Sequence, residues 1–294
     1  MKNKNALQRF IFDNLAVRGE LVHLEECFQE IMQQHDYPLV IRTILGEMLA
    51  AASLLCASVK FKGRLTIQFQ GAGKLKLLMA QCTDDNGLRG LAQWREAIQP
   101  EELLPLLKQG TLAVIIDPEE SAGNRYQGIV AWEGDSLASS LEGYFKYSEQ
   151  IPTRIWLAVD EERAAGMFIQ QMPQANQDTQ ADQDWEHVSL LTSTITAHEL
   201  LTLENETLLN RLYAEDDVRL FEPDAVQFRC TCSEKRSENA LRLVGQEEIN
   251  EELREKQKIT VTCEFCNKEY DFDKVDIAKI FTEGNKPDGS TQIH

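Results

Sequence analysis

The chain has 294 residues, of which 30 are Lys or Arg and 48 are Asp or Glu, so its formal net charge is −18. This length, with an apolar fraction of 43%, is enough for one large domain with a substantial core and a smaller second domain. The negative charge opposes attraction to phosphate backbones and anionic lipids, which disfavours nucleic acid and membrane surfaces as partners.

The N-terminal segment predicts a protein that stays in the cytoplasm. Residues 1–20 include basic residues but no continuous apolar stretch and no small-residue cleavage site of the kind found in secretory signals. The most apolar run, around residues 48–59, is too short to cross a bilayer. We therefore expect no membrane span.

Residues 1–173 alternate between helical and strand-like patterns and predict a large α/β core domain. Helical periodicity marks residues 21–35 and 41–59. Alternating apolar and polar residues, interrupted by the Gly71-Ala72-Gly73 break, predict an antiparallel hairpin. The predicted strands cover residues 63–70, 73–81, 111–117, 126–132 and 153–160. The fold class is α+β, with an antiparallel sheet covered by helices on one face.

Residues 174–229 predict a linker of metastable helices. From Met172 to Trp185 the chain is rich in Gln, Asn, Asp and Thr, which is typical of a flexible connector. Thr196 and Glu199 form the pattern of a capping box. Apolar stripes mark short amphipathic helices at Trp185, Val188, Leu191 and Ile195, and at Leu208, Leu209 and Leu212. Such short helices have marginal stability in isolation, so they must dock on a larger domain. They either dock reversibly, as a conditional linker, or form an ordinary helical hairpin that is packed permanently on the core domain.

Residues 230–294 predict a small zinc-binding domain. A helix pair is expected around residues 239–243 and 247–256, with Gly245 ending the first helix. A strand leading into a turn, a second strand and a short helix follow, and the polar tail from Glu283 is expected to be disordered.

Four of the seven cysteines lie close together near the C-terminus. They form the pairs Cys230-x-Cys232 and Cys263-x-x-Cys266, with 30 residues between the pairs. Four thiolates in two close pairs suit one tetrahedral Zn²⁺ ion, because soft sulfur ligands favour zinc over magnesium or calcium. A section this short gains much of its folding free energy from the metal, about 10–16 kcal/mol for structural zinc.

The same four sulfurs predict sensitivity to oxidation. Zinc keeps sulfur deprotonated, and the thiolate is the form that oxidants attack. A disulfide between Cys230 and Cys232 would close a small, strained ring, and strained disulfides are readily reduced. Oxidation would then remove the ligands, and local unfolding could spread into the linker. The alternative is an inert structural zinc site that only holds the segment together.

The other reactive side chains predict no catalytic site. Cys27, Cys56 and Cys82 have no partner at metal or nucleophile spacing and are interpreted as structural. The five histidines are dispersed, and adjacent acids such as Glu161 and Glu162 lack the opposed geometry of catalytic carboxylates. We therefore expect a protein that is not an enzyme.

The cysteine pairs, at this separation and position, resemble those of the redox-regulated 33-kilodalton heat-shock chaperones, a family of bacterial holdases. Residues 16–24, 45–82 and 144–159 also look like segments of that family. The resemblance implies an N-terminal core, a middle linker and a C-terminal redox switch in which Cys230, Cys232, Cys263 and Cys266 hold one Zn²⁺ ion in the inactive, reduced state.

The resemblance also implies a route of activation by oxidation. Oxidants form the disulfides Cys230–Cys232 and Cys263–Cys266, zinc leaves, and the linker unfolds. The activated form is a homodimer that holds unfolding client proteins without ATP, until downstream ATP-dependent chaperones refold them.

Two alternatives from other classes remain at this stage. One is a thiol-disulfide oxidoreductase that uses Cys263 and Cys266, which would turn over repeatedly with a thiol reductant. The other is a zinc-ribbon module for nucleic acid, which the net charge opposes.

Overall fold

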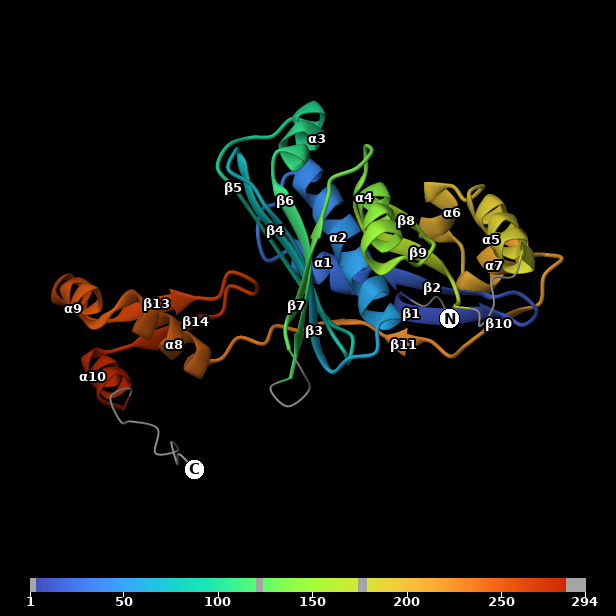
Figure 1. Ribbon diagram of the computed structural model, residues 1–294. Helices are drawn as coiled ribbons and strands as arrows, with labels where there is room; N and C mark the ends of the chain where they lie inside the picture. Colours follow the sequence, from blue (N-terminus) through green and yellow to red (C-terminus); the bar gives the residue numbers. More distant parts are fainter. Residues whose placement is uncertain (1–3, 120–123, 174–178, 284–294) are drawn as a thin grey trace, which may run out of the picture. The chain divides into compact units, whose positions relative to one another are not determined.

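The structure, a computed structural model, describes residues 4–119, 124–173 and 179–283. The chain divides into two compact units, Met1–Arg229 and Cys230–His294 (Figure 1). Each unit is described by itself below. The three-part division at residues 173 and 229, which separates a linker from the core, stays a prediction.

The first unit contains two six-stranded sheets in which all pairs except β12–β5 are antiparallel. One has the order β10-β1-β2-β9-β8, with β11 also pairing with β1, and the other the order β12-β5-β4-β3-β6-β7. The strands of the first sheet are β1 (Asn5–Phe12), β2 (Val17–Leu24), β8 (Thr153–Val159), β9 (Ala164–Gln171), β10 (Val218–Leu220) and β11 (Asp224–Ala225). Those of the second are β3 (Gly63–Gln70), β4 (Leu75–Thr83), β5 (Gly87–Trp94), β6 (Thr111–Pro118), β7 (Tyr126–Val130) and β12 (Gln227–Phe228).

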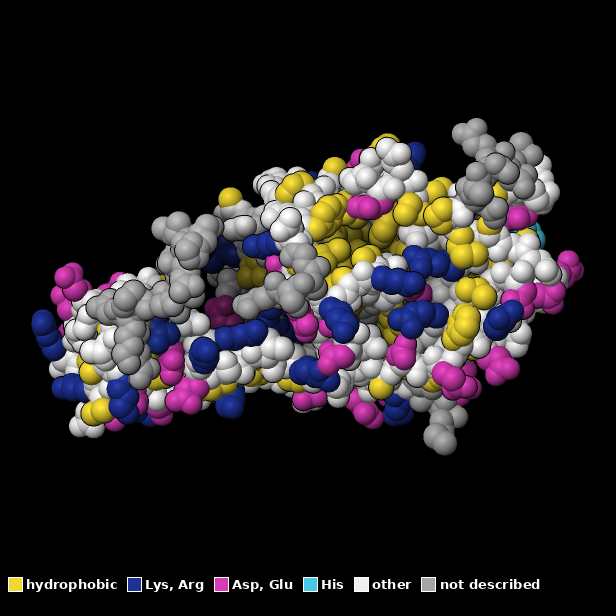
Figure 2. Space-filling view, turned by 60° about the horizontal axis from the view of Figure 1, so that its bottom comes forward, with side chains coloured by type: hydrophobic (Ala, Val, Ile, Leu, Met, Phe, Trp, Pro, Cys, Tyr) yellow, Lys and Arg dark blue, Asp and Glu magenta, His cyan; other side chains and the backbone are white. Residues whose placement is uncertain are grey.

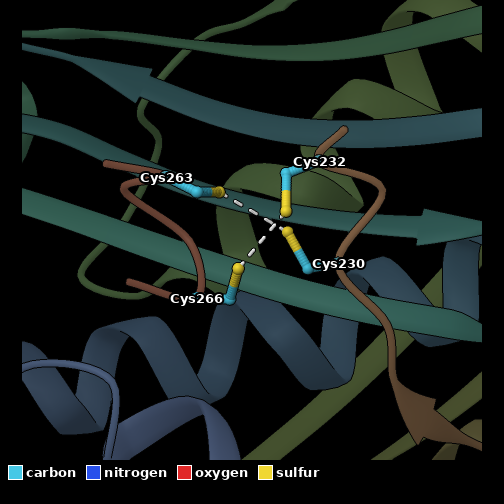
Figure 3. A group of neighbouring side chains, drawn as sticks. All are labelled: Cys230, Cys232, Cys263 and Cys266. Carbon is cyan, nitrogen blue, oxygen red and sulfur yellow. Dashed lines mark hydrogen bonds between the residues drawn. The ribbon is translucent and has the colours of Figure 1, made fainter. Parts of the chain in front are cut away.

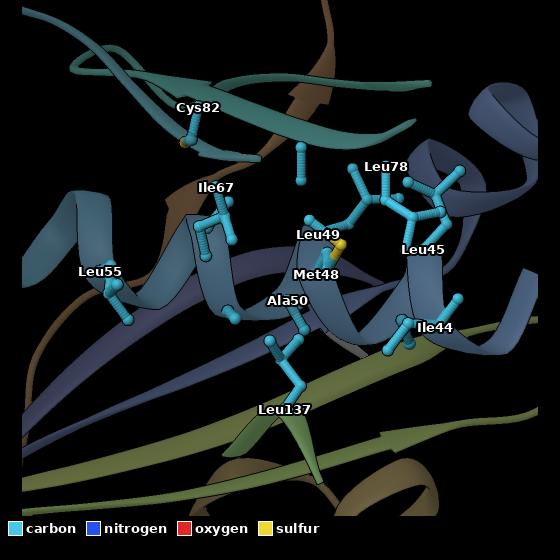
Figure 4. Close-up of a cluster of buried hydrophobic side chains, with 14 of the residues drawn as sticks. Ile44, Leu45, Met48, Leu49, Ala50, Leu55, Ile67, Leu78, Cys82 and Leu137 are labelled. Atoms are coloured by element: carbon cyan, nitrogen blue, oxygen red, sulfur yellow. The ribbon is translucent and has the colours of Figure 1, made fainter. Parts of the chain in front are cut away.

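The α+β fold class and the predicted hairpin are confirmed, and the arrangement of the layers is corrected. β3 pairs with β4 from Arg64↔Thr83 to Gln70↔Leu77, as the glycine break predicts. One sheet with helices on one face is wrong, because α2 (Leu39–Ser58) packs against strands of both sheets (Figure 1). In Figure 4, Leu78 and Cys82 lie on one side of this helix and Leu137 on the other. A helix that is apolar on nearly all sides buries most surface in this position.

The helix predicted over residues 41–59 is confirmed as α2, which begins slightly earlier, at Leu39, and contains most of the apolar run around residues 48–59. Within the described residues it is the one helix long and apolar enough to span a bilayer, but 72% of its most apolar window is buried in the protein. Its environment is therefore that of a core helix.

Residues 21–35 do not form the single helix predicted. They are divided between β2 and α1 (Glu26–Met32), because β2 pairs with β1 on one side and with β9 on the other. Two ladders of hydrogen bonds outweigh a weak local preference for helix. The remaining elements of the core are α3 (Pro100–Lys108), α4 (Leu137–Tyr144) and the π-helical turn η1 (Phe145–Glu149).

The outer face of the first sheet is covered by α5 (Thr179–Thr192), α6 (Ala197–Thr202) and α7 (Asn205–Leu212), at the right of Figure 1. The capping box of Thr196 and Glu199 is confirmed at the start of α6. Part of the predicted flexible connector is wrong: residues 179–185 are already helical, and Gln171 donates a hydrogen bond to the carbonyl of Ala181, 3.0 Å away. The rest of that connector, residues 174–178, lies outside the described residues.

The buried residues shared by this sheet and its covering helices form one apolar cluster, called here the docking cluster. Its members are Phe10, Phe12, Val17, Leu21, Ala158, Ala165, Met167, Ile169, Val188, Leu200, Leu208, Leu209, Leu212 and Tyr213. Both apolar stripes predicted in the linker therefore contribute buried residues to it.

The second unit contains α8 (Glu234–Val244), α9 (Gln246–Glu255), β13 (Ile259–Thr262), β14 (Glu269–Phe272) and α10 (Lys274–Glu283). Gly245 ends α8 with a positive φ of 105°, as predicted. A small core joins these elements, made by Leu241, Ile249, Leu253, Ile259, Phe272, Ile277 and Ile280. The predicted disorder after Glu283 concerns residues outside the described ranges.

Candidate metal centre

The structure brings the four C-terminal cysteines together from two separate loops. Cys230 and Cys232 lie in the irregular segment before α8, and Cys263 and Cys266 lie in the turn between β13 and β14. All four sulfurs lie within 4.8 Å of one another. The distance between sulfurs is 3.6 Å from Cys230 to Cys263 and 3.5 Å from Cys232 to Cys266 (Figure 3).

The second pair is positioned by the hairpin of β13 and β14. The Cys263 amide donates to the Lys268 carbonyl at 2.9 Å, which closes the ladder. The Cys263 carbonyl accepts from the amides of Cys266, at 3.3 Å, and Asn267, at 2.8 Å. Asn267 has a φ of 54°, a left-handed conformation that asparagine tolerates well. The turn therefore follows from residues next to the two cysteines in sequence.

The first pair is positioned by the start of α8. Ser233 is the N-cap of this helix, and its side chain accepts a hydrogen bond from the Arg236 amide. The Arg236 guanidinium donates to both the carbonyl and the hydroxyl oxygen of Thr231, at 2.6 and 2.5 Å. Thr231 is the residue between the two cysteines, so one side chain of the first helical turn holds their backbone.

Tyr270 connects the sulfurs to the small core of the second unit. Its ring packs against that core, and its hydroxyl donates a hydrogen bond to the Cys232 sulfur at 3.2 Å. No sequence pattern points to Tyr270, because its contact with a cysteine 38 residues away depends on the tertiary structure.

The thiols of Cys232, Cys263 and Cys266 have different pKa values. Burial raises the pKa of Cys232, but hydrogen bonds from Tyr270 and the other thiols outweigh it and lower that pKa to about 7. Burial raises the pKa of Cys263 and, more strongly, of Cys266. The hydrogen bond to Cys232 raises the pKa of Tyr270 to about 12. Cys232 thus ionises more readily than Cys263 and Cys266.

The arrangement fits a tetrahedral thiolate site. Zinc–sulfur bonds of about 2.3 Å place the sulfurs of a regular tetrahedron about 3.8 Å apart. Two of the sulfur–sulfur distances, 3.5 and 3.6 Å, lie slightly below this value, and all four sulfurs are within 4.8 Å of one another. Among the described His, Cys, Asp and Glu residues, this is the one group of three or more whose ligand atoms are placed to hold a metal ion.

The other three cysteines lie apart from this group. Cys27, Cys56 and Cys82 are buried in the core of the first unit, and burial raises the pKa of Cys27 to about 12. The thiols of Cys56 and Cys82 both lie near the Thr83 carbonyl, at 3.3 and 3.6 Å. Such buried thiols behave as small apolar side chains.

A family model described as Hsp33 protein matches residues 5–273. The chain belongs to the Hsp33 family. Two curated relatives carry the name 33 kDa chaperonin: that of Pseudomonas paraeruginosa is 45% identical over 302 residues and that of Nitrosococcus oceani is 45% identical over 295 residues. In both cases the comparison covers 100% of this chain and 100% of the relative.

The fold of the Hsp33 family is also seen in a solved structure. The crystal structure of the 33 kDa chaperonin from Thermotoga maritima superposes with a TM-score of 0.80, covering 95% of this chain and 99% of that chain, at 22% identity. The chain is thus a member of a chaperone family, and its four-cysteine cluster is compatible with redox-regulated zinc binding.

Proposed function

We propose that this chain is a redox-regulated holdase that needs no ATP and binds unfolding proteins when its C-terminal thiols are oxidised. The observation that carries the proposal is the cluster of four sulfurs within 4.8 Å, whose first member directly follows Arg229, the last residue of the unit that contains the covering helices and the apolar sheet face beneath them. Sulfur chemistry at one point of the chain can thereby control the order of the neighbouring segment.

Cys230, Cys232, Cys263 and Cys266 would hold one Zn²⁺ ion in the reduced, inactive state. The metal would keep the sulfurs ionised and would tie the segment before α8 to the β13–β14 turn. Because the apolar core of the second unit is small, loss of this tie would remove much of its folding free energy.

Oxidation converts the four thiols into two disulfides, which we propose to be Cys230–Cys232 and Cys263–Cys266. Each disulfide forms as its two sulfurs lose two electrons, and one hydrogen peroxide molecule takes up these electrons with two protons and becomes two water molecules. The sulfur distances of 3.5 and 3.6 Å join cysteines of different pairs, so the proposed pairing depends on how the two loops relax rather than on these distances.

The client-binding surface would be the sheet face that the linker covers. Phe10, Leu21 and Met167 belong to the docking cluster and have exposed fractions of 0% with α5–α7 in place. Release of the linker would expose these side chains and also free the apolar stripes of α5–α7. Apolar surfaces of this kind bind other proteins without requiring a defined sequence.

The proposed setting is the cytoplasm, where thiols stay reduced until oxidative stress. The activated form would be a homodimer that passes its clients to downstream ATP-dependent refolding chaperones. The face in Figure 2 shows Lys and Arg interspersed with Asp and Glu, and this mixture, with the net charge of −18, gives no support to nucleic acid as a partner.

The decisive experiment heats a substrate protein with the purified chain, either reduced or treated with peroxide, while light scattering and zinc release are recorded together. We expect scattering to be suppressed by the oxidised protein alone, with zinc released as the thiols disappear. Equal suppression in both states, or zinc that stays bound after the thiols are oxidised, would overturn the mechanism. Repeated turnover of a thiol reductant would instead favour an oxidoreductase.

A further inference from the structure

Three polar side chains, two of them buried and one half-buried, meet where the linker lies on the core strands. Gln8 extends from β1, His23 from β2, and Asn205 is the first residue of α7. Gln8 and Asn205 are 7% and 5% exposed, and they adjoin a cavity of about 270 Å³ that His23 also lines. Polar groups this deeply buried require partners.

These side chains form a chain of hydrogen bonds with a fixed direction. The amide nitrogen of Gln8 donates to the Phe221 carbonyl at 2.7 Å, and a backbone carbonyl can only accept. The side-chain oxygen of Gln8 therefore accepts from the Asn205 amide nitrogen at 2.9 Å. The Asn205 oxygen then faces Nε2 of His23 at 2.9 Å, so Nε2 carries the proton.

We propose that Gln8, His23 and Asn205 form a polar latch that fixes the linker in one docked register and releases it in acid. The proposal rests on the proposed function, because it concerns the linker whose release would expose the client surface. The latch joins two parts of the linker, α7 and the segment after β10, to two neighbouring core strands.

The reason for a latch is that apolar contacts alone do not define a register. The side chains of Leu208, Leu209 and Leu212 can bury similar areas in shifted positions on the sheet. A displaced α7 would take away the hydrogen bonds that Asn205 makes to the Gln8 oxygen and to Nε2 of His23, and the loss of such bonds at a buried position is costly. The hydrogen-bond chain therefore makes one docked position more stable than its neighbours.

His23 supplies the sensitivity to acid. With Nε2 protonated in the latch, a second proton would place a charged imidazolium beside the cavity. Burial and the positive charge of Arg163 both lower the pKa of His23, although the hydrogen bond to Asn205 opposes them. Lys4 lies on the cavity and pairs with Glu25 at 3.1 Å.

The other charged groups that face the cavity come from the linker. They are Glu204, which precedes α7, and Glu206 in its first turn. Both are exposed to solvent, so water screens their attraction for a charged His23.

The direction of the pH effect on linker docking follows from the lowered pKa of His23. A released linker exposes His23, which then titrates near the ordinary value of about 6.5. Docking keeps its full stability above that pH and loses stability as the pH falls below it, because the released state binds the additional proton more readily. Mild acid should therefore open the linker in the reduced protein without thiol oxidation.

The experiment is hydrogen exchange of the α7 amides in the full-length, reduced, zinc-bound protein, between about pH 7.5 and 5.5, on both sides of the ordinary histidine pKa. Protection factors are corrected for intrinsic exchange, and bound zinc is measured at each pH. We expect protection of Leu208, Leu209 and Leu212 to fall as pH falls, by at most about tenfold per pH unit for one proton, with zinc retained.

Two variants and their matched controls separate the latch from general unfolding. Asn205→Ala should lower α7 protection about ten- to hundredfold at neutral pH, whereas Asn210→Ala, at an exposed position on the same helix, should leave it unchanged. His23→Gln keeps a donor for Asn205 and should abolish the pH dependence, whereas His198→Gln, exposed on α6, should preserve it.

Equal protection in Asn205→Ala and Asn210→Ala would overturn the latch. A pH dependence that survives in His23→Gln, or that appears only where zinc is lost, would overturn its acid release. None of these results requires oxidation or a client protein, so the scattering and zinc-release experiment would still decide the proposed function independently.

Discussion

Phe10 on β1 lies directly opposite Gly19 on β2, and its ring occupies the space that a side chain at position 19 would need. A Cβ atom built on Gly19 would lie 2.1 Å from Cζ of Phe10. The Phe10 ring also packs beside Phe12 and the linker residue Tyr213, with centroid distances of 6.0 and 6.3 Å. The missing side chain at position 19 thus allows an aromatic ring to lie where the linker docks.

Gly19→Ala should loosen the linker in the reduced protein. The added methyl group must displace the Phe10 ring, and overpacking of this kind costs about 1–3 kcal/mol. We expect lower protection of the linker amides from exchange and partial holdase activity without oxidant. The control is Gly166→Ala, where a Cβ would lie 2.8 Å from Cδ1 of Leu54 on the opposite face of the same sheet. That variant should lower the melting temperature without selectively exposing the linker.

Leu208→Ala should activate the protein by removing apolar contact from the docking cluster. Leu208 is 0% exposed, and a buried Leu→Ala change costs about 2–5 kcal/mol. Suppression of substrate aggregation by the reduced variant, measured as light scattering, is the expected result. Leu190→Ala is the matched control, since Leu190 is 68% exposed on α5 and its loss should change neither docking nor activity. Identical scattering curves for both reduced variants would contradict a linker that covers the client surface.

Cys266→Ser should weaken metal binding, because a hydroxyl is a much poorer ligand than a thiolate for a soft tetrahedral site. The visible absorption spectrum of the cobalt-substituted protein reports thiolate ligation directly, without any assay of activity. We expect the spectrum to change and the affinity for zinc to fall by at least about tenfold. Cys27→Ala, in the core of the first unit, should retain the unaltered spectrum. If both variants bind cobalt alike, Cys266 is not a metal ligand.

Glu20→Gln should stabilise the protein at alkaline pH. Burial raises the pKa of Glu20 to about 7, and Arg18 and Arg9 offset this only partly. The unfolded chain ionises near pH 4.5 while the folded chain still holds the proton, so the free energy of unfolding falls between pH 4.5 and about 7. The raised pKa of Glu20 corresponds to an increase of at most about 3 kcal/mol in the free energy of unfolding for Glu20→Gln above pH 7.

Denaturant unfolding at several pH values measures this gain. The advantage of Glu20→Gln should disappear below pH 4.5, where both states of the wild-type chain are protonated. Glu30→Gln, at an exposed position, provides the comparison for the substitution itself and should not reproduce the gain above pH 7. A constant difference between wild type and Glu20→Gln at every pH would mean that packing rather than ionisation separates them.

The sequence by itself determined the features that depend on neighbouring residues. The hairpin at Gly71-Ala72-Gly73, the capping box of Thr196 and Glu199, and the helix end at Gly245 are all confirmed, because turns and caps are built from local backbone geometry. The spacing of the two cysteine pairs likewise identified a group that the fold brings together, and its role as a zinc ligand set stays a prediction.

Only the tertiary structure decided the features that depend on distant partners. Residues 21–24 became strand because β1 and β9 offered hydrogen bonds on both sides, and α2 was enclosed by two sheets rather than resting on one. Tyr270 reached Cys232, and Asn205 reached Gln8 across 197 residues of sequence. Such contacts leave no mark in a single sequence, since the energy of a buried polar group depends on the partner that folding places beside it.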